Sequence, residues 1–251
     1  MFNSYIELLK EKSFSKDESR FYALQLLEMH KEILKRENIS ILELGVDKGQ
    51  STKVFLNAIK DKQKSSLISV DIRECLNKFN FSNWQFVKSD SANISYVVSQ
   101  APIIKKGIDI LYIDSLHTKK HVYKEIYGYF EYLNKDACIF FDDVDSTPYM
   151  RNQRKDSVGT EIANREIIEL IEAVFNSNLN QLNFSSIRGS TGLARLDKLS
   201  IKGEKLNKPK YIKKRRNKLI WKLIRLITNK TRFSDKFSQS DKFSVNLEEN
   251  K

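Results

Sequence analysis

The sequence has few cysteines and no long hydrophobic run, and both absences exclude classes of protein. Cys75 and Cys138 lie far apart in a chain of 251 residues, so free thiols are favoured over a disulfide framework. No apolar run approaches the roughly 20 residues needed to cross a bilayer. The first residues contain no basic segment followed by an apolar one, so we expect no signal peptide. These features predict a cytoplasmic protein.

The net charge of +12 is concentrated at the end of the chain. Residues 201–251 carry 16 Lys and Arg against 5 Asp and Glu, whereas residues 1–200 carry 28 against 27. Because the body of the chain is nearly neutral, it offers no broad basic groove, and we expect no nucleic-acid partner. The overall content of 40% hydrophobic and 30% charged residues is typical of a globular protein.

One stretch combines a short apolar run, an acid and two glycines. Residues 41–44 form the run, which includes Glu43, and Gly45 and Gly49 follow before a helical pattern begins at about Gln50. This order predicts a strand, a tight turn and a helix N-terminus that faces a ligand crevice. The acid would repel a pyrophosphate but suits a cationic amine. An ordinary strand-to-helix connection, with glycines for packing, is the alternative.

Short apolar runs alternate with amphipathic ones from Ile39 onward, which indicates an α/β domain with a mostly parallel sheet and helices on both faces. We interpret the runs as strands at residues 39–44, 67–71, 84–87, 108–113, 137–141, 181–185 and 193–196. Helices are predicted at residues 50–59, 119–134 and 161–175, with a polar loop at 146–160.

This pattern divides the chain into three parts. Residues 1–37 are interpreted as a helical lead-in that packs on the sheet or covers the crevice. Residues 38–200 form the α/β domain, and residues 201–251 form a basic tail.

Residues 211–228 of the tail form an amphipathic pattern at helical period, with Lys and Arg on one face and apolar residues on the other. Such a helix suits an anionic membrane surface, which would place the protein at the inner face of the membrane. The alternative is a helix that packs on the body, or on a second subunit of a homo-oligomer.

Acidic residues follow the predicted strands at the edge where a ligand binds. Asp71 ends the second strand, where its carboxylate can accept hydrogen bonds from both hydroxyls of a ribose. Asp114, Asp142 and Asp143 end two adjacent strands, so their carboxylates can converge. Converging carboxylates repel one another unless a cation or proton intervenes, and an all-oxygen set suits Mg²⁺. His117 could then take the proton of a metal-bound hydroxyl.

The glycine turn resembles motif I of the class I S-adenosylmethionine (SAM) methyltransferases. The resemblance implies a Rossmann-like sheet of seven strands that ends in an antiparallel pair. It also implies that SAM is the cofactor, with Asp90 on the exocyclic amine of the adenine. The implied cofactor-binding residues are Glu43, Gly45, Gly49, Ser51, Asp71, Asp90, Ser91 and Asp114.

Two further motifs, residues 113–117 and 140–143, resemble those of the metal-dependent O-methyltransferases. The pattern is most similar to the sugar O-methyltransferases of macrolide tailoring, with the related cephalosporin-hydroxylase and rhamnosyl O-methyltransferase group. Many of those proteins have a His-Asp pair where this chain has two aspartates. The resemblance implies a hydroxyl of a sugar or glycan precursor as the acceptor. The implied site consists of Mg²⁺ held by Asp114, Asp142 and Asp143, with His117 as the general base.

Each of these residues also has a purely structural interpretation. Asp71 and Asp90 could be N-caps of following helices, and the acidic pair after the fifth strand could cap the next segment. His117 could begin a helix without a chemical task. His117 and His121, four residues apart, could also form a two-histidine metal face, although no suitable glutamate follows His117.

The sequence therefore predicts a SAM-dependent O-methyltransferase, with two other classes of function left open. One is an RNA methyltransferase anchored by the basic tail, which the neutral body and the lack of an Asn-Pro-Pro-Tyr-type amine site disfavour. The other is a hydroxylase-like protein that keeps the fold without methyl transfer. We also expect a Gly45→Val substitution to abolish SAM binding while leaving the fold largely intact.

Overall fold

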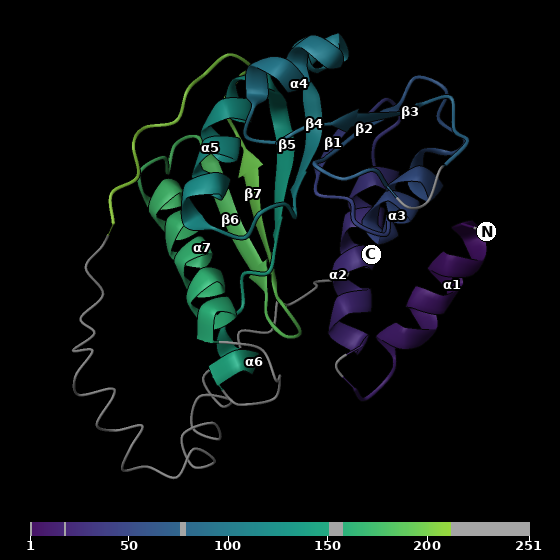
Figure 1. Ribbon diagram of the computed structural model, residues 1–251, viewed down its shortest axis with the longest axis horizontal. Coiled ribbons are helices and arrows are strands. Elements are labelled where there is room, and N and C mark those ends of the chain that lie inside the picture. The colour runs from purple at the N-terminus through teal and green to yellow at the C-terminus, as the bar shows by residue number, and fades with distance from the viewer. Residues whose placement is uncertain (1, 18, 76–78, 151–157, 212–251) are drawn as a thin grey trace, which may run out of the picture.

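The computed structural model describes residues 2–17, 19–75, 79–150 and 158–211, and a seven-stranded sheet forms its centre (Figure 1). The strand order is β3-β2-β1-β4-β5-β7-β6. Strands β1 to β5 pair in parallel, and β7 runs antiparallel to both β5 and β6. This is the Rossmann-like methyltransferase sheet that the sequence predicts, including its antiparallel pair at one edge.

The strands lie close to the predicted apolar runs. They are β1 (Ser40–Leu44), β2 (Ser66–Asp71), β3 (Trp84–Lys88), β4 (Ile108–Ile113), β5 (Leu133–Asp142), β6 (Leu182–Ile187) and β7 (Leu193–Lys198). The helices are α1 (Phe2–Ser13), α2 (Ser19–Leu34), α3 (Gln50–Ile59), α4 (Ile94–Gln100), α5 (Lys119–Tyr129), α6 (Thr147–Met150) and α7 (Val158–Asn176), with short 3-10 helices η1 (Pro102–Lys106) and η2 (Phe130–Tyr132).

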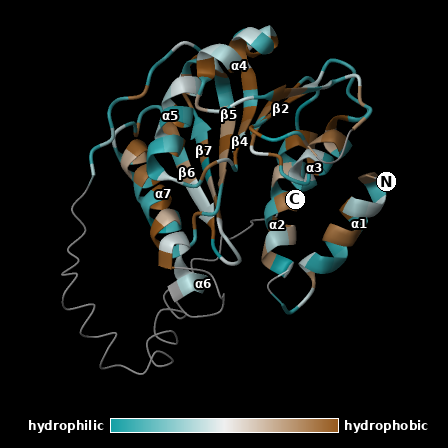
Figure 2. Ribbon diagram, in the orientation of Figure 1, coloured by the Kyte–Doolittle hydropathy of each residue, from teal (hydrophilic) through white to brown (hydrophobic). Residues whose placement is uncertain are grey.

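Helices cover both faces of the sheet, with α1, α2 and α3 on one face and α4, α5 and α7 on the other (Figure 1). Successive residues of a strand point to opposite faces, so Ile41 packs with the first set of helices and Leu42 with the second. Both side chains are fully buried. Hydrophobic residues of β2 and β4 lie between the two helical layers (Figure 2). This double burial is why the strands are apolar runs rather than alternating ones.

The predicted lead-in is helical and packs on the sheet. A charged network joins it to the antiparallel edge, where Glu32 of α2 forms an ion pair with Arg195 of β7 at 3.0 Å. Arg36 follows α2 and contacts the Cys138 thiol of β5 at 3.3 Å. Burial raises the pKa of Glu32, but Arg195 and Lys35 outweigh it and bring that pKa down to about 2. The lead-in is therefore attached by charge as well as by apolar packing.

The bounds of three elements differ clearly from the prediction. The helix expected to reach residue 134 ends at Tyr129, and β5 begins at Leu133, four residues earlier than predicted. The buried Lys198 ammonium donates to the carbonyls of Phe130 and Leu133, so it satisfies backbone oxygens where the helix gives way to the strand. Helix α7 begins at Val158 rather than at residue 161, and α6 lies within the expected polar loop.

The first residues of the predicted tail pack against the domain. The Tyr127 hydroxyl of α5 donates to the carbonyl of Asn207 at 2.6 Å, and the Lys119 ammonium lies 3.9 Å from the centre of the Tyr211 ring. Apart from Tyr211, the amphipathic segment predicted at 211–228 lies outside the described residues, so its membrane-surface and subunit roles stay predictions. No helix in the described ranges is long and apolar enough to cross a membrane.

Candidate functional site

The glycine turn brings the ends of β1 and β4 unusually close together. Gly45 has a φ of +93°, and its N–H donates to the Val70 carbonyl at 2.8 Å. A Cβ placed on Gly45 would lie 1.9 Å from the carbonyl oxygen of Asp114. The expectation that Gly45→Val would leave the fold intact is therefore wrong, because backbone atoms occupy the space that the new side chain would need. Gly49, with a φ of +68°, is the N-cap of α3.

Glu43 faces the start of α3 and is completely buried. Its carboxylate accepts hydrogen bonds from Ser51 Oγ at 2.6 Å, Thr52 Oγ1 at 2.9 Å and Ser69 Oγ at 2.5 Å. Burial raises the pKa of Glu43 to about 7, although the three hydroxyls oppose the shift. Glu43 and Ser51 are therefore hydrogen-bonded to each other. Their contact with the cofactor stays a prediction. Thr52 and Ser69 were not singled out from the sequence.

Asp71 joins the end of β2 to the glycine turn. Its carboxylate accepts from the N–H groups of Val46 at 2.9 Å, Asp47 at 3.2 Å and Arg73 at 2.9 Å. Burial raises its pKa, but these bonds outweigh burial, so the net pKa is below the ordinary value. Asp71 is not a helix N-cap, since no helix follows β2 directly in the described chain. A carboxylate offers about four acceptor positions, so capacity for a ribose hydroxyl remains.

Asp90 and Ser91 follow β3 but face different surroundings. The Asp90 side chain is 61% exposed and accepts from the N–H of Ala92 at 2.8 Å. Asn93, not Asp90, is the N-cap of α4. The Ser91 side chain is buried, and its hydroxyl donates to Glu125 Oε1 at 2.5 Å. Asp90 can therefore reach a ligand directly, whereas the Ser91 hydroxyl is directed into the interior.

The predicted convergence of acids at the ends of β4 and β5 is present. The Tyr112 hydroxyl lies 3.1 Å from Asp114 Oδ2 and 3.1 Å from Asp142 Oδ2, and Thr191 Oγ1 donates to Asp142 Oδ1 at 3.1 Å. Burial and the neighbouring Asp114 and Asp143 raise the pKa of Asp142 to about 8. A single hydroxyl proton cannot serve two carboxylates fully, so a protonated Asp142 fits this arrangement. Tyr112 and Thr191 were not predicted as site residues.

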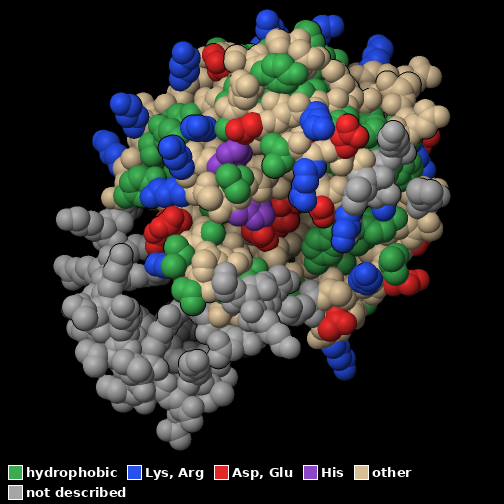
Figure 3. Space-filling model, viewed as in Figure 1, with side chains coloured by type: hydrophobic (Ala, Val, Ile, Leu, Met, Phe, Trp, Pro, Cys, Tyr) green, Lys and Arg blue, Asp and Glu red, His purple; other side chains and the backbone are tan. Residues whose placement is uncertain are grey.

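His117 lies between two of these acids. Its Nε2 is 3.1 Å from Asp114 Oδ1, and its Nδ1 is 2.8 Å from Asp143 Oδ2. Burial lowers the pKa of His117, but the two carboxylates outweigh burial and bring it to about 10. His117 is therefore an imidazolium at neutral pH in this arrangement. Histidine and acidic side chains gather on the same face of the molecule (Figure 3).

The two-histidine metal face is not formed, because His117 contacts Asp114 and Asp143 whereas His121 contacts Glu125. Within the described ranges, no group of three or more His, Cys, Asp or Glu side chains is arranged to hold a metal ion. The chemical type of the donors nevertheless fits a hard cation, since three carboxylates meet with one imidazolium among them. Binding of such a cation would require His117 to leave its position between the acids.

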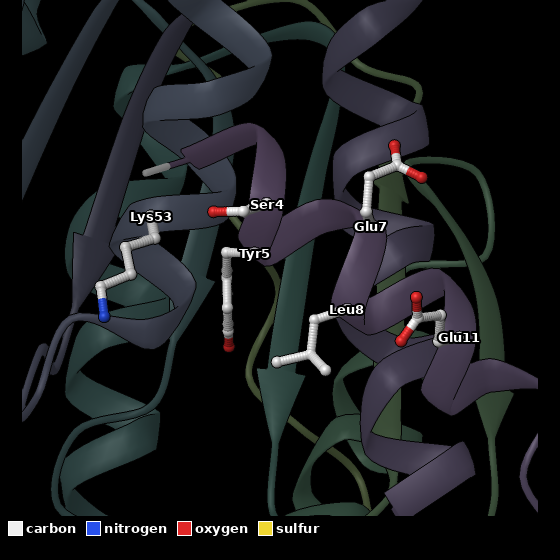
Figure 4. Close-up of a pocket in the computed structure, with 6 residues that line it drawn as sticks. All are labelled: Ser4, Tyr5, Glu7, Leu8, Glu11 and Lys53. Carbon is white, nitrogen blue, oxygen red and sulfur yellow. The ribbon is translucent and has the colours of Figure 1, made fainter.

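The lead-in contributes side chains beside this cluster. The hydroxyls of Tyr5 and Tyr22 both donate to Gln50 Oε1, at 3.2 and 2.8 Å. Burial raises the pKa of Tyr22, and nearby Tyr5, Asp142 and Asp114 raise it further. Helix α2 therefore lies close to the acids. An open groove of about 590 Å³ lies next to Tyr5; it is lined by Ser4, Tyr5, Glu7, Leu8, Glu11 and Lys53 (Figure 4).

Comparison with known proteins finds a family match for the central part of the chain. Residues 42–144 match the family model described as a methyltransferase domain. An uncharacterized protein of Acanthamoeba polyphaga mimivirus is 29% identical over 133 residues, which are 47% of this chain and 57% of that protein. The chain thus spans little more than half the length of this relative.

Solved structures share the fold at low identity. An O-methyltransferase from Bacillus cereus in complex with SAH has a TM-score of 0.53 and 12% identity, covering 79% of this chain and all of that one. The MycE methyltransferase of the mycinamycin biosynthetic pathway, in complex with Mg and SAH, has a TM-score of 0.52 and 12% identity, covering 84% of this chain and 57% of that one. Residues 42–144 therefore match a methyltransferase domain, and the described chain shares its fold with these solved methyltransferases.

Proposed function

We propose that this protein transfers the methyl group of SAM to a hydroxyl of a sugar or glycan precursor. The observation that supports this most is the contact between the glycine turn and the acid cluster. A Cβ on Gly45 would strike the backbone of Asp114, which itself pairs with His117. A cofactor bound at the turn would therefore present its sulfonium beside the pair of Asp114 and His117.

The proposed cofactor site follows the carboxyl ends of β1, β2 and β3. Glu43 accepts a hydrogen bond from Ser51 next to the turn, and Asp71 at the end of β2 accepts one from the turn itself. Asp90 follows β3 and is exposed. An amino-acid end at Gly45, a ribose at Asp71 and an adenine at Asp90 would follow this order. SAH in the Bacillus cereus and MycE complexes supports the cofactor class by analogy of fold.

The proposed acceptor site lies at the ends of β4 and β5. Asp114, Asp142 and Asp143 would hold a Mg²⁺ ion, whose charge would compensate the three carboxylates and polarise the acceptor hydroxyl. The same carboxylates raise the pKa of His117 to about 10, which blocks a base role at neutral pH. Once a cation compensates the charge of the carboxylates, the His117 imidazole can be neutral and accept the hydroxyl proton. Metal dependence and the base role of His117 are thus linked.

The chemistry of the step balances with these groups. The acceptor oxygen would bond to the SAM methyl carbon with loss of the carbon–sulfur bond, which would leave SAH as a neutral thioether. His117 would take the hydroxyl proton. Tyr22, which donates to Gln50 and whose pKa the charges of Asp142 and Asp114 raise, would lie on the acceptor side of this site.

Turnover of SAM on a panel of nucleotide sugars and glycans, with and without Mg²⁺, tests the proposal. We expect SAH to accumulate with at least one such acceptor and to stop accumulating when a chelator is added. Methylation of RNA but not of sugars would instead support the alternative of a tail-anchored RNA enzyme. Tight SAH binding without methylation of any acceptor would support the non-methylating alternative.

A further inference from the structure

A second cluster of polar side chains lies behind the loop that follows β3. Glu125 of α5 is completely buried, and its Oε1 accepts from Ser91 Oγ at 2.5 Å and Ser115 Oγ at 2.6 Å. His121 Nε2 lies 3.2 Å from the same oxygen. Because Ser91 follows β3 and Ser115 follows β4, one carboxylate joins the ends of two strands to the start of α5.

Burying the Glu125 carboxylate costs free energy, so this cluster differs from polar side chains at the surface. A buried carboxylate is stabilised by donors and by a nearby positive charge. Its Oε1 has both, but its Oε2 has no hydrogen-bond partner in the described part of the chain. An unsatisfied buried oxygen of this kind calls for an explanation beyond packing.

His121 lies between the buried Glu125 carboxylate and side chains nearer the surface. Its Nε2 is 3.0 Å from Ser91 Oγ and 3.8 Å from Asp90 Oδ1. The Ser91 hydroxyl donates to Glu125, so it is an acceptor toward His121, whose Nε2 then carries a proton. The His121 side chain is 13% exposed and that of Asp90 is 61% exposed. The imidazole therefore lies between a buried acid and the exposed acid proposed to hold the adenine.

We propose that His121, held by Glu125, is a positioning residue for the adenine end of the cofactor: its imidazolium keeps the Asp90 carboxylate oriented toward the exocyclic amine. The inference rests on the proposed cofactor site, because it assigns Asp90 to the adenine. It adds a pH-dependent group at the adenine end of that site, apart from the glycine turn and the acid cluster.

Several charges determine when His121 is protonated. The hydrogen bond that His121 donates to Glu125 raises the pKa of His121, burial lowers it, and the charges of Glu125 and Asp90 raise it further. Lys124, on the same helix, lowers it. The net direction is upward, so the imidazolium persists to higher pH than in a histidine free in solution. As pH rises through this pKa, Asp90 loses its cationic partner and its hold on the adenine should weaken.

Calorimetric titration of SAH across pH 6 to 9, without acceptor, tests the inference. We expect the Kd of the unaltered protein, relative to that of His121→Gln at the same pH, to increase about two- to five-fold as pH rises and then level off, the range for an ion pair partly exposed to solvent. His121→Gln should bind more weakly than the unaltered protein at low pH and equally at high pH, whereas a contribution from Glu43 would act alike in both proteins. Glu125→Gln should shift the transition to lower pH.

His30 offers a matched control, because it is a partly buried histidine on α2 that contacts Asn57 Oδ1 at 2.8 Å, away from this cluster. His30→Gln should keep the pH transition of the unaltered protein. Equal pH profiles in the unaltered protein and in His121→Gln would overturn the inference while leaving SAH binding, and hence the proposed cofactor site, in place. If the unaltered protein does not bind SAH, the proposed function fails and the inference fails with it.

Discussion

Two histidines lie four residues apart near the start of α5, and each lies between two acids. His117 uses both ring nitrogens, one toward Asp114 and one toward Asp143, whereas His121 contacts Glu125 and, more distantly, Asp90 through Nε2 alone. The acids around His117 come from the ends of two strands. Those around His121 are a buried residue of its own helix and an exposed loop residue.

The difference shows how surroundings assign tasks to the same side chain. His117 has its positive charge enclosed by acids that a cation could compensate, so its protonation depends on what binds there. His121 has a buried acid as its partner, which favours the charged imidazole, and this charge can orient Asp90. The first arrangement suits proton transfer and the second suits positioning. Four predictions test this contrast, from the largest expected effect to the smallest.

Gly45→Ala should disturb both histidine clusters at once, because the new Cβ would meet the carbonyl of Asp114 and the N–H of Ser115. Positive φ alone costs a non-glycine residue about 1–3 kcal/mol, and the contact adds to this. We expect a loss of more than about 3 kcal/mol in the free energy of unfolding, measured by denaturant titration.

Gly203→Ala is the matched control for that variant. Gly203 has a φ of +91°, close to that of Gly45, but a Cβ there would meet nothing within 4 Å. The difference between the two variants therefore isolates the contact with Asp114 from the backbone strain. Equal losses of stability would show that the ends of β1 and β4 do not need their close approach.

His117→Ala should lower turnover by roughly 10²–10⁴-fold, the usual range for a positioned acid–base group. The affinity for SAH should barely change, which is the reverse of the pattern expected for His121→Gln. The loss should shrink at high pH, where the acceptor hydroxyl ionises without help. Steady-state turnover and SAH calorimetry on the same samples measure both. Near-normal turnover at neutral pH would return His117 to a structural role.

Asp142→Asn should raise the thermal stability of the metal-free protein while weakening activation by Mg²⁺. The pKa of Asp142 is raised to about 8, so the folded protein favours the protonated acid. Its ionisation therefore costs stability progressively as pH rises from about 4 toward 8. The gain in melting temperature should be small near pH 4 and largest above pH 8. A gain independent of pH would contradict the repulsion among the three acids.

Binding of SAH should release part of a proton from Glu43 near pH 7. The pKa of Glu43 is about 7, and a nearby ammonium group would favour its ionised form. We expect release of about half a proton or less at pH 7, read from calorimetry in two buffers with different ionisation enthalpies. Glu43→Gln should release correspondingly less. Identical release in both proteins would make Glu43 a support for the turn and not a contact of the cofactor.

Much of the proposed acceptor site, at the ends of β4 and β5, could be predicted because it depends on local sequence. Runs such as residues 108–113 and 137–141 are apolar since both faces of those strands are buried, and the acids that end them mark the edge of the sheet. Once β4 and β5 are neighbours, Asp114, Asp142 and Asp143 have to meet. The three-residue spacing then places His117 beside them.

The supporting side chains could not be predicted in the same way. Glu125 is an acid among lysines and tyrosines on α5, yet it is completely buried on the same face as Val122 and Tyr129. Its spacing from these apolar residues, and its position four residues after His121, were the local signs of this arrangement. Tyr112 was likewise interpreted only as part of a strand, although its hydroxyl contacts two of the site acids.

The sequence by itself determined the order of strands and helices, the glycine turn and the acids at strand ends, because apolar periodicity and positive-φ glycines act over a few residues. Tertiary structure alone decided which acids are paired, which are buried and which histidine each one holds. These properties depend on the distance between groups from different elements and on the water excluded around them. The pKa values of His117, Asp142 and Glu43 therefore follow from the folded arrangement and not from the residue types.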